Sequence, residues 1–176
     1  MKKIAIIGSG GSGKSTFARK LGEKLQIEVF HLDAILWKPN WTAVSKNQQE
    51  AIQHQLVSKD QWIIDGNYNG TLDLRLNAAD CIIFMDMPRK LCVYRVFKRM
   101  LLYRNRQRPD MAEGCRERFD LNFLKWIWNY PRDKRPGVYQ KLQRLQDHKE
   151  IVILTSSKEA RNFISQLKTE NPVTVK

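Results

Sequence analysis

A short segment near the N-terminus combines glycine, serine and lysine in a pattern suited to binding phosphate. Residues 8–15, GSGGSGKS, fit the P-loop pattern G-x-x-x-x-G-K-[ST]. The glycines allow backbone conformations that a side chain would obstruct, so successive N–H groups can point into a phosphate-sized cavity. We expect Lys14 to reach the β- and γ-phosphates and the Ser15 hydroxyl to bind Mg²⁺.

The context of this segment separates a P-loop from a chance glycine turn. An apolar run, residues 3–7, precedes it, and a helical pattern, residues 14–25, follows it. A helix N-terminus there adds its dipole to anion binding. The residues expected to bind the phosphates are Gly8, Gly10, Gly11, Ser12, Gly13, Lys14, Ser15 and Thr16.

Two aspartates stand where apolar strands are expected to end. A P-loop protein needs an acidic residue near its magnesium, and Asp65, which closes WIID, is the best candidate. The alternative for Asp65 is an ordinary Asp-Gly turn. Asp33, after the second strand, could act as a base toward an acceptor hydroxyl or bind a magnesium water. Its alternative is a helix N-cap.

Arginines suited to a transferring phosphate follow the fourth strand. Arg95 and Arg99 lie four residues apart on one helical pattern and therefore share a face. For this pair we favour a role on the moving phosphate. Arg104, Arg106 and Arg108 follow in a polar stretch that could close over the phosphates as a flap. For any single arginine, a solvated basic face is the favoured alternative.

Short apolar segments alternate with helical patterns along the whole chain, which predicts an α/β fold with a mainly parallel sheet. Because such sheets bind ligands at the carboxyl ends of their strands, the P-loop, Asp33 and Asp65 should converge. We expect one domain, residues 1–170, with a helical lid or insert at about 100–135 and a tail at 171–176. The strands are expected at residues 3–7, 27–33, 61–67, 80–88 and 150–156, and the helices at 14–25, 45–59, 89–104, 115–130, 133–146 (after Pro136) and 157–168.

Charge and composition restrict the partners. The net charge is +13, and residues 89–144 hold 16 Lys/Arg against 5 Asp/Glu, which places +11 of it there. Such a balance suggests nucleic acid, an anionic surface or a phosphorylated ligand. No apolar run approaches the roughly 20 residues of a membrane span, and the N-terminal run is too short for a secretory signal. We therefore predict a cytoplasmic protein without a membrane partner.

Cysteines and tryptophans are both interpreted as packing residues. The three cysteines, Cys81, Cys92 and Cys115, are widely spaced, and the histidines are scattered, so reduced structural thiols are expected. Trp62 lies in a strand and is expected in the core. Trp37 and Trp41 flank Pro39 just after Asp33, where an acceptor could lie, but packing is favoured for each tryptophan.

With these residues in place, the chain resembles adenylate kinase in IAIIGSGGSGKST, WIIDG and CIIFMDMPRKLCVYRVFKR. More closely, it resembles the bacterial DNA topology modulation protein family, whose members are adenylate-kinase-related, in HLDAILWKPNW, WIIDGNY and RFDLNFLKWIWNY. The similarity covers nearly the whole chain.

This resemblance implies the P-loop NTPase fold of nucleoside monophosphate kinases, with a five-stranded parallel core, helices on both faces and an arginine-bearing lid. It implies ATP with Mg²⁺ as phosphoryl donor. Lys14 and Ser15 would serve the phosphates and magnesium, with Asp65 as the magnesium-side carboxylate. Arg95 and Arg99 would clasp the transferring phosphate. Residues 155–158 would lie beside the adenine.

The chain departs from adenylate kinases after its Asp-Gly. Those enzymes continue with Phe-Pro-Arg, whose arginine grips the acceptor phosphate, whereas this chain has Asn67 and Tyr68 and its next arginine is Arg75. The departure counts against AMP as acceptor. We favour an ATP-dependent small-molecule or nucleotide kinase whose acceptor lies near Asp33 and Arg75. The alternative is an ATP-regulated nucleic-acid-binding protein that influences DNA topology; it ranks second because a basic lid explains the same charge.

Overall fold

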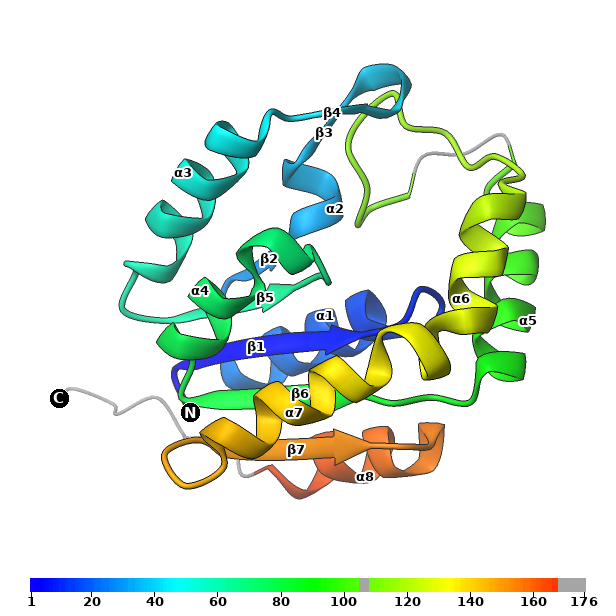
Figure 1. The fold of residues 1–176 in the computed structure, drawn as a ribbon. Helices are drawn as coiled ribbons and strands as arrows, with labels where there is room; N and C mark the ends of the chain where they lie inside the picture. The colour runs from blue at the N-terminus through cyan, green and yellow to red at the C-terminus, as the bar shows by residue number, and fades with distance from the viewer. Residues whose placement is uncertain (105–107, 168–176) are drawn as a thin grey trace, which may run out of the picture.

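The core of the protein is a five-stranded sheet (Figure 1). The computed structural model describes residues 1–104 and 108–167. The strand order is β2-β5-β1-β6-β7, and every neighbouring pair is parallel. The predicted mainly parallel α/β sheet is therefore confirmed. The five strands are β1 (Lys3–Gly8), β2 (Val29–His31), β5 (Trp62–Asp65), β6 (Cys81–Met85) and β7 (Glu150–Leu154).

The strand order explains where a ligand can bind. From central β1 the chain runs to the edge strand β2, returns through β5 and then crosses to β6 and β7 on the other side. The order therefore reverses at β1, and a crevice opens beyond the carboxyl ends of strands at such a switch point. The P-loop follows β1 at this place.

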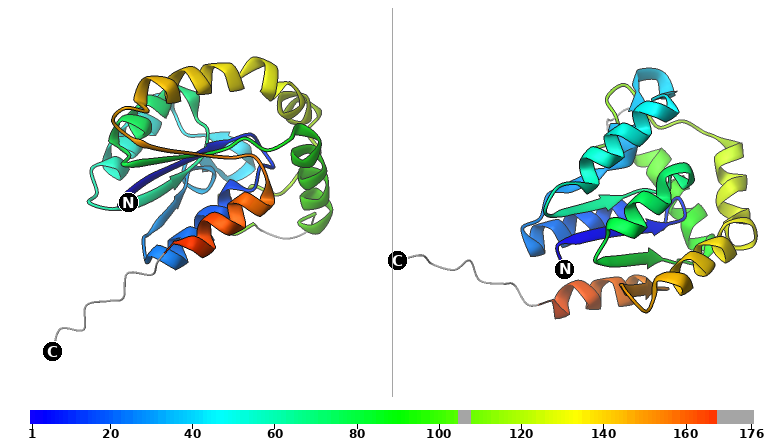
Figure 2. Two further views of the ribbon diagram at one scale, coloured as in Figure 1. Left: turned by 90° about the horizontal axis from the view of Figure 1, so that it is seen from below. Right: turned by 60° about the vertical axis from the view of Figure 1, so that its left-hand side comes forward.

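Helices cover both faces of the sheet, as Figure 2 shows. Alternate residues of β1 face opposite sides: Ile4 and Ile6 pack with α1, α5 and α8, whereas Ala5 and Ile7 pack with α3, α4 and α7. All four side chains are fully buried, which is the pattern of a sheet covered on both faces. The α-helices are α1 (Lys14–Leu25), α2 (Leu32–Ile35), α3 (Lys46–Val57), α4 (Leu72–Ala78), α5 (Arg89–Leu102), α6 (Leu121–Asp133), α7 (Arg135–Leu145) and α8 (Ser157–Gln166).

Smaller elements complete the architecture. A short antiparallel hairpin, β3 (Trp37–Lys38) and β4 (Thr42–Ala43), encloses the 3-10 helix Pro39–Trp41. A second 3-10 helix, Asn69–Thr71, leads into α4. Within the described residues no helix has both the length and the apolar character that a membrane span requires. Cys81, Cys92 and Cys115 are buried and free of disulfides, as expected for structural thiols.

Several predicted element boundaries were wrong, and three of them have a clear local cause. The helix expected from residue 115 begins at Leu121, because the Asp120 carboxylate accepts a hydrogen bond from the Phe123 N–H and caps the helix there. The second strand ends at His31, because α2 starts directly after it. The helix expected after Pro136 begins at Arg135, with the proline in its first turn, a position where its missing N–H costs nothing. Helix α4 and the β3–β4 hairpin were not predicted.

Candidate active site

The P-loop forms the floor of a cavity of about 920 Å³. Gly13 caps α1 with a φ of +96°, and Gly11 has a φ of +74°, so both occupy backbone conformations that favour glycine. Gly8 does not line the cavity; it is the last residue of β1, and its N–H donates to Asn67 Oδ1 at 3.0 Å. The expected phosphate-binding residues that line the cavity are Gly10, Gly11, Ser12, Gly13, Lys14, Ser15 and Thr16.

Gly11→Ala is expected to destabilise the fold. A Cβ at Gly11 would lie 2.3 Å from the backbone oxygen of Cys92, and the φ is positive as well. The left-handed conformation alone costs about 1–2 kcal/mol, so calorimetry should show Tm lowered by roughly 2–8 °C. Gly70→Ala is the matched control, because no atom lies within 4 Å of its added Cβ. Equal Tm values for the two variants would show that the loop has more room than the structure indicates.

Lys14 is held against its own loop. Its Nζ donates to the backbone oxygen of Ser9 at 2.9 Å. Burial lowers the pKa of Lys14, whereas the charges of Asp65 and Asp33 act in the opposite direction. The hydroxyls of Ser9 and Ser12 are buried without a hydrogen-bond partner among the described residues. Because unpaired buried polar groups are costly, these hydroxyls fit a loop built to surround a polar ligand.

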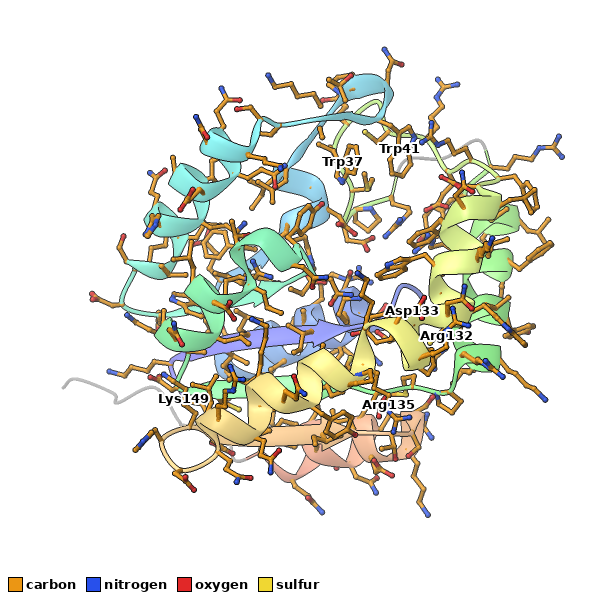
Figure 3. The ribbon with its side chains drawn as sticks, viewed as in Figure 1. Trp37, Trp41, Arg132, Asp133, Arg135 and Lys149 are labelled. Atoms are coloured by element: carbon orange, nitrogen blue, oxygen red, sulfur yellow. The ribbon has the colours of Figure 1, made fainter. Side chains whose placement is uncertain are left out.

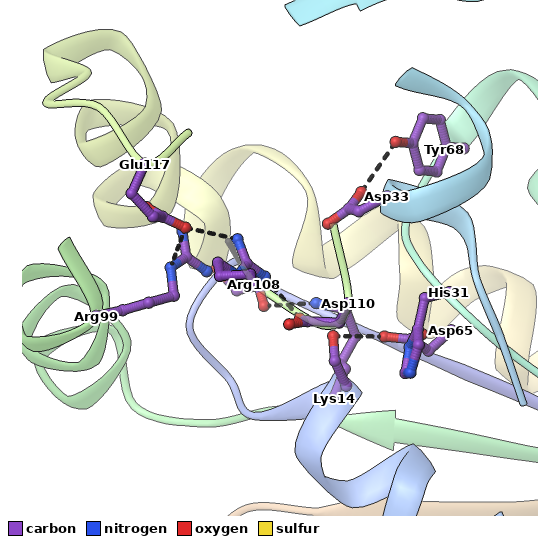
Figure 4. Close-up of polar contacts among 11 residues, drawn as sticks. Lys14, His31, Asp33, Asp65, Tyr68, Arg99, Arg108, Asp110 and Glu117 are labelled. Atoms are coloured by element: carbon purple, nitrogen blue, oxygen red, sulfur yellow. Dashed lines mark hydrogen bonds and ion pairs between the residues drawn. The ribbon is translucent and has the colours of Figure 1, made fainter. Parts of the chain in front are cut away.

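The carboxylate of Asp65 accepts a hydrogen bond from the first turn of α1 (Figure 4). Ser15 Oγ donates to Asp65 Oδ2 at 2.8 Å, and His31 Nδ1 donates to Asp65 Oδ1. Burial lowers the pKa of His31, but the hydrogen bond and charge of Asp65 outweigh it, so the pKa lies above its ordinary value. Asp65 is buried at the end of β5. The predicted convergence of Asp65 with the P-loop is confirmed, and a hydroxyl beside a carboxylate is a donor set that fits Mg²⁺.

Asp33 lies in the same cavity and does not cap a helix. It falls within the first turn of α2, whose N-cap is His31. The Tyr68 hydroxyl donates to Asp33 Oδ1 at 2.9 Å. Burial raises the pKa of Asp33, although Lys14 and the Tyr68 hydrogen bond oppose the rise. The carboxylate is therefore a better proton acceptor than an exposed aspartate would be.

Comparisons with solved structures place this geometry in a known fold. Shikimate kinase from Acinetobacter baumannii in complex with shikimate matches with a TM-score of 0.56 and 17% identity, over 94% of this chain and 89% of that chain. Shikimate kinase from Bacteroides thetaiotaomicron gives 0.52 and 13% identity over 92% and 93%. An unliganded sugar kinase from Janibacter sp. HTCC2649 gives 0.50 and 12% identity over 94% and 91%.

The chain has the P-loop kinase fold. No protein-family model matches the sequence, and no curated protein does. The likeness is thus one of structure.

Arg95 and Arg99 lie on α5 and both line the cavity. Arg95 donates to the backbone oxygen of Ser12 at 2.9 Å and to Ser157 Oγ at 2.7 Å, so it joins the P-loop to the segment after β7. The solvated-face alternative is wrong for this residue, because its guanidinium is held inside the cavity. Arg104 is exposed, and Arg106 lies outside the described residues.

Arg99 and Arg108 share one carboxylate (Figure 4). Arg99 Nε lies 2.9 Å and Arg108 Nη1 lies 2.7 Å from Glu117 Oε1. Arg108 Nη2 also donates to Asp110 Oδ2 at 2.6 Å. Burial lowers the pKa of Arg99, and the neighbouring charge of Arg108 acts in the same direction. This four-residue cluster joins α5 to the irregular segment before α6, and all four residues line the cavity.

Glu117→Gln is expected to destabilise the protein strongly. The Glu117 side chain is 5% exposed, so the change would remove the charge that Arg99 and Arg108 share, while Arg108 would keep its ion pair with Asp110. Breaking a buried ion pair in this way costs about 3 kcal/mol, which corresponds to a Tm decrease of roughly 6–12 °C. Glu50→Gln, on the exposed surface of α3, is the control. If both variants unfolded at the same temperature, the shared ion pair would contribute nothing.

The expected acceptor contact from Arg75 is wrong. Arg75 is fully buried on α4, outside the cavity lining. Its Nη2 donates to the backbone oxygens of Gly66 at 3.1 Å and Asn67 at 3.3 Å, and its Nη1 donates to Gln53. Burial lowers its pKa to about 10. Arg75 therefore supports the turn after β5, and its guanidinium does not reach the cavity.

Several residues of the candidate site were missed from the sequence. Tyr68 and His31 carried a weak signal, because each lies next to a strand end that holds a candidate aspartate. Asp110 and Glu117 carried none, since they belong to no motif. Trp62 is buried in the core as predicted. Trp37 and Trp41 pack, as predicted, against the buried cluster of Met111, Ala112 and Cys115, and both also line the cavity.

Proposed function

We propose that the protein is an ATP-dependent phosphotransferase that phosphorylates a hydroxyl group of a small molecule or nucleotide. The observation that carries the proposal is the convergence of a P-loop lysine, a hydroxyl–carboxylate pair and the half-buried Asp33 at one end of the sheet. Ser15 and Asp65 form the pair at 2.8 Å, and Lys14 and Asp33 line the same space. Three solved structures of similar fold are two shikimate kinases and a sugar kinase. Their names support a phosphotransferase that acts on a small molecule.

In the proposed reaction, the acceptor oxygen attacks the γ-phosphorus of ATP and the bond to the β–γ bridging oxygen breaks, which releases ADP. Asp33 takes the proton of the acceptor hydroxyl. Lys14 and Arg95 neutralise charge on the phosphates, and Arg99 reaches the transferring group from α5. Most of the rate enhancement then comes from positioning and electrostatics. Mg²⁺, held by Ser15 and through Asp65, would offset charge on the β- and γ-phosphates.

The adenine is proposed to lie between α1 and α8. Thr16 and Lys20 line the cavity from α1, and Ser157 and Arg161 line it from α8. The hydrogen bond from Arg95 to Ser157 brings this side of the cavity against the P-loop. The sequence resemblance of residues 155–158 to the adenine-side loop of adenylate kinases supports the same placement.

Membership of the DNA topology modulation protein family is part of this proposal. It rests on the phrases HLDAILWKPNW, WIIDGNY and RFDLNFLKWIWNY. The single domain of residues 1–170, expected from the chain length and the alternating pattern, and the lid at about 100–135, which the resemblance implies, belong to the same proposal. The alternative of an ATP-regulated nucleic-acid-binding protein is less favoured, because Arg95, Arg99 and Arg108 of the basic region face the cavity.

The test is ADP release from Mg-ATP with and without a panel of nucleosides, nucleoside monophosphates and small hydroxyl metabolites. Lys14→Ala serves as the blank. Acceptor-dependent ADP formation in the wild type alone would support the proposal. ADP release that no acceptor stimulates would indicate an ATPase or a switch. Absence of turnover, together with salt-sensitive DNA binding, would favour the nucleic-acid alternative.

A further inference from the structure

Three aromatic side chains line the same cavity as Asp33. Trp37 and Trp41 line the cavity on this side and contact each other edge to face, with ring centroids 5.6 Å apart at 70°. Figure 3 shows the pair beneath the β3–β4 hairpin, turned toward the irregular segment before α6. Tyr68 lines the cavity as well, and its hydroxyl donates to Asp33. The ring surfaces and the candidate base therefore belong to one subsite.

The backbone that presents Trp41 is held in an unusual conformation. Asn40 and Trp41 both have a positive φ, +62° and +59°, which is rare for a bulky side chain. The Asn40 N–H donates to the Gly114 oxygen at 3.3 Å, and Trp41 Nε1 donates to the Arg116 oxygen at 3.0 Å. Conformations of this kind persist where surrounding contacts enforce them, and they cluster at ligand sites. These bonds hold Trp41 against the segment that covers the subsite.

Three of the arginines around this subsite have carboxylate partners. Arg99 and Arg108 share Glu117, and Arg108 also binds Asp110. Arg118 lies over the Trp41 ring, 5.0 Å from its centroid, and 3.9 Å from Asp120. Arg19 lines the cavity from α1 but is exposed, so water screens its charge. An anionic acceptor could pair with Arg99 or Arg108 only by displacing a bound carboxylate, and it would also face Asp33.

We infer that the acceptor is an uncharged alcohol that carries a flat ring, as a nucleoside does, and that it bears no phosphate or carboxylate. This inference rests on the proposed kinase function. The hydroxyl would approach Asp33, and the ring would lie against Trp37 and Trp41. The burial of Arg75 agrees with it, because the arginine that follows the Asp-Gly turn is unable to grip an acceptor phosphate.

The experiment compares ligands that share a ring and differ in whether they carry an anionic group. Four nucleosides are tested against their 5′-monophosphates, and benzyl alcohol against 4-(hydroxymethyl)benzoate. Binding in the presence of Mg-ADP is measured by isothermal titration calorimetry, and turnover by ADP release from Mg-ATP. The uncharged member of a pair is expected to bind about tenfold more tightly or better, because the charged one meets carboxylates.

Trp37→Leu and Trp128→Leu form the variant pair. Loss of ring stacking at Trp37 should weaken nucleoside binding by roughly 5- to 100-fold, with Mg-ATP affinity retained as a check on folding. Trp128 is exposed on α6 outside the cavity lining, so its variant should bind as the wild type does.

The outcomes separate this inference from the proposed function. Preferred phosphorylation of the monophosphates or the benzoate would overturn the inference and leave the kinase function standing. Binding of uncharged ring alcohols that depends on Trp37, without ADP release, would support the subsite and contradict the kinase function. Absence of binding by every uncharged ligand, or binding unaffected by Trp37→Leu, would overturn the inference.

Discussion

Lys14→Ala is expected to lower ATP turnover by about 10²- to 10³-fold, the usual cost of removing one group that stabilises transition-state charge. Lys14 lines the cavity beside Asp65 and Asp33, and the fold places its Nζ within 2.9 Å of the loop oxygen of Ser9. A nucleotide phosphate would replace that oxygen as the partner of the ammonium group. The measurement is kcat and KM for Mg-ATP with the acceptor found in the panel.

The control for this prediction is Lys46→Ala. Lys46 carries the same charge, is exposed at the start of α3 and does not line the cavity. It should retain wild-type turnover, and both variants should keep the circular dichroism spectrum of the wild type. Turnover retained in Lys14→Ala would remove Lys14 from the reaction and contradict the P-loop assignment.

Asp33→Asn is expected to reduce kcat by about 10²- to 10⁴-fold, with a smaller effect on the affinity for Mg-ATP. The amide preserves the shape of the side chain and still accepts the Tyr68 hydrogen bond, but it does not take a proton. Asp60→Asn, an exposed position outside the cavity, is the matched control. A kcat reduced less than tenfold would indicate that another group, or water, accepts the proton.

The pH dependence of the wild type adds an independent readout. Burial raises the pKa of Asp33 above the ordinary value of 3.8, and only the carboxylate form can accept a proton. Activity should therefore fall on acidification with a midpoint above 3.8. Tyr68→Phe removes a hydrogen bond that favours the charged form, so the acid limb should move to still higher pH in that variant. A shift to lower pH would assign the limb to a different group.

The sequence shows the basic region as a total charge, whereas the fold decides which partner each of its arginines has. Residues 89–144 contain most of the net charge. Within this region, Arg95 donates a hydrogen bond to the P-loop oxygen of Ser12, and Arg99 forms an ion pair with Glu117. Others lie on the outer surface: Arg132 pairs with Asp133, and Arg135 with Asp86 (Figure 3). The basic residues of this region therefore lie in two environments, the cavity and the outer surface.

The sequence by itself determined the features that depend on local backbone geometry. The glycines of residues 8–15 and the helix after them specify a phosphate-binding loop, because the positions that need a positive φ or lack space for a Cβ accept only glycine. Continuous apolar runs identified the buried strands, since a sheet covered on both faces needs apolar residues on both sides. Parallel strands also bring their carboxyl ends together, so the meeting of Asp65 with Ser15 followed from their places in the chain.

Only the tertiary structure decided which side chains surround the acceptor side of the cavity. Asp110 and Glu117 belong to an irregular segment without periodicity, and their ion pairs depend on the path of that segment across α5. The same holds for Trp41, which reaches the cavity because the hairpin bonds to Gly114 and Arg116. Arg75 turned inward because the turn after β5 leaves carbonyl oxygens that need donors. Pairings between residues this distant in the chain arise from packing, and no local pattern encodes them.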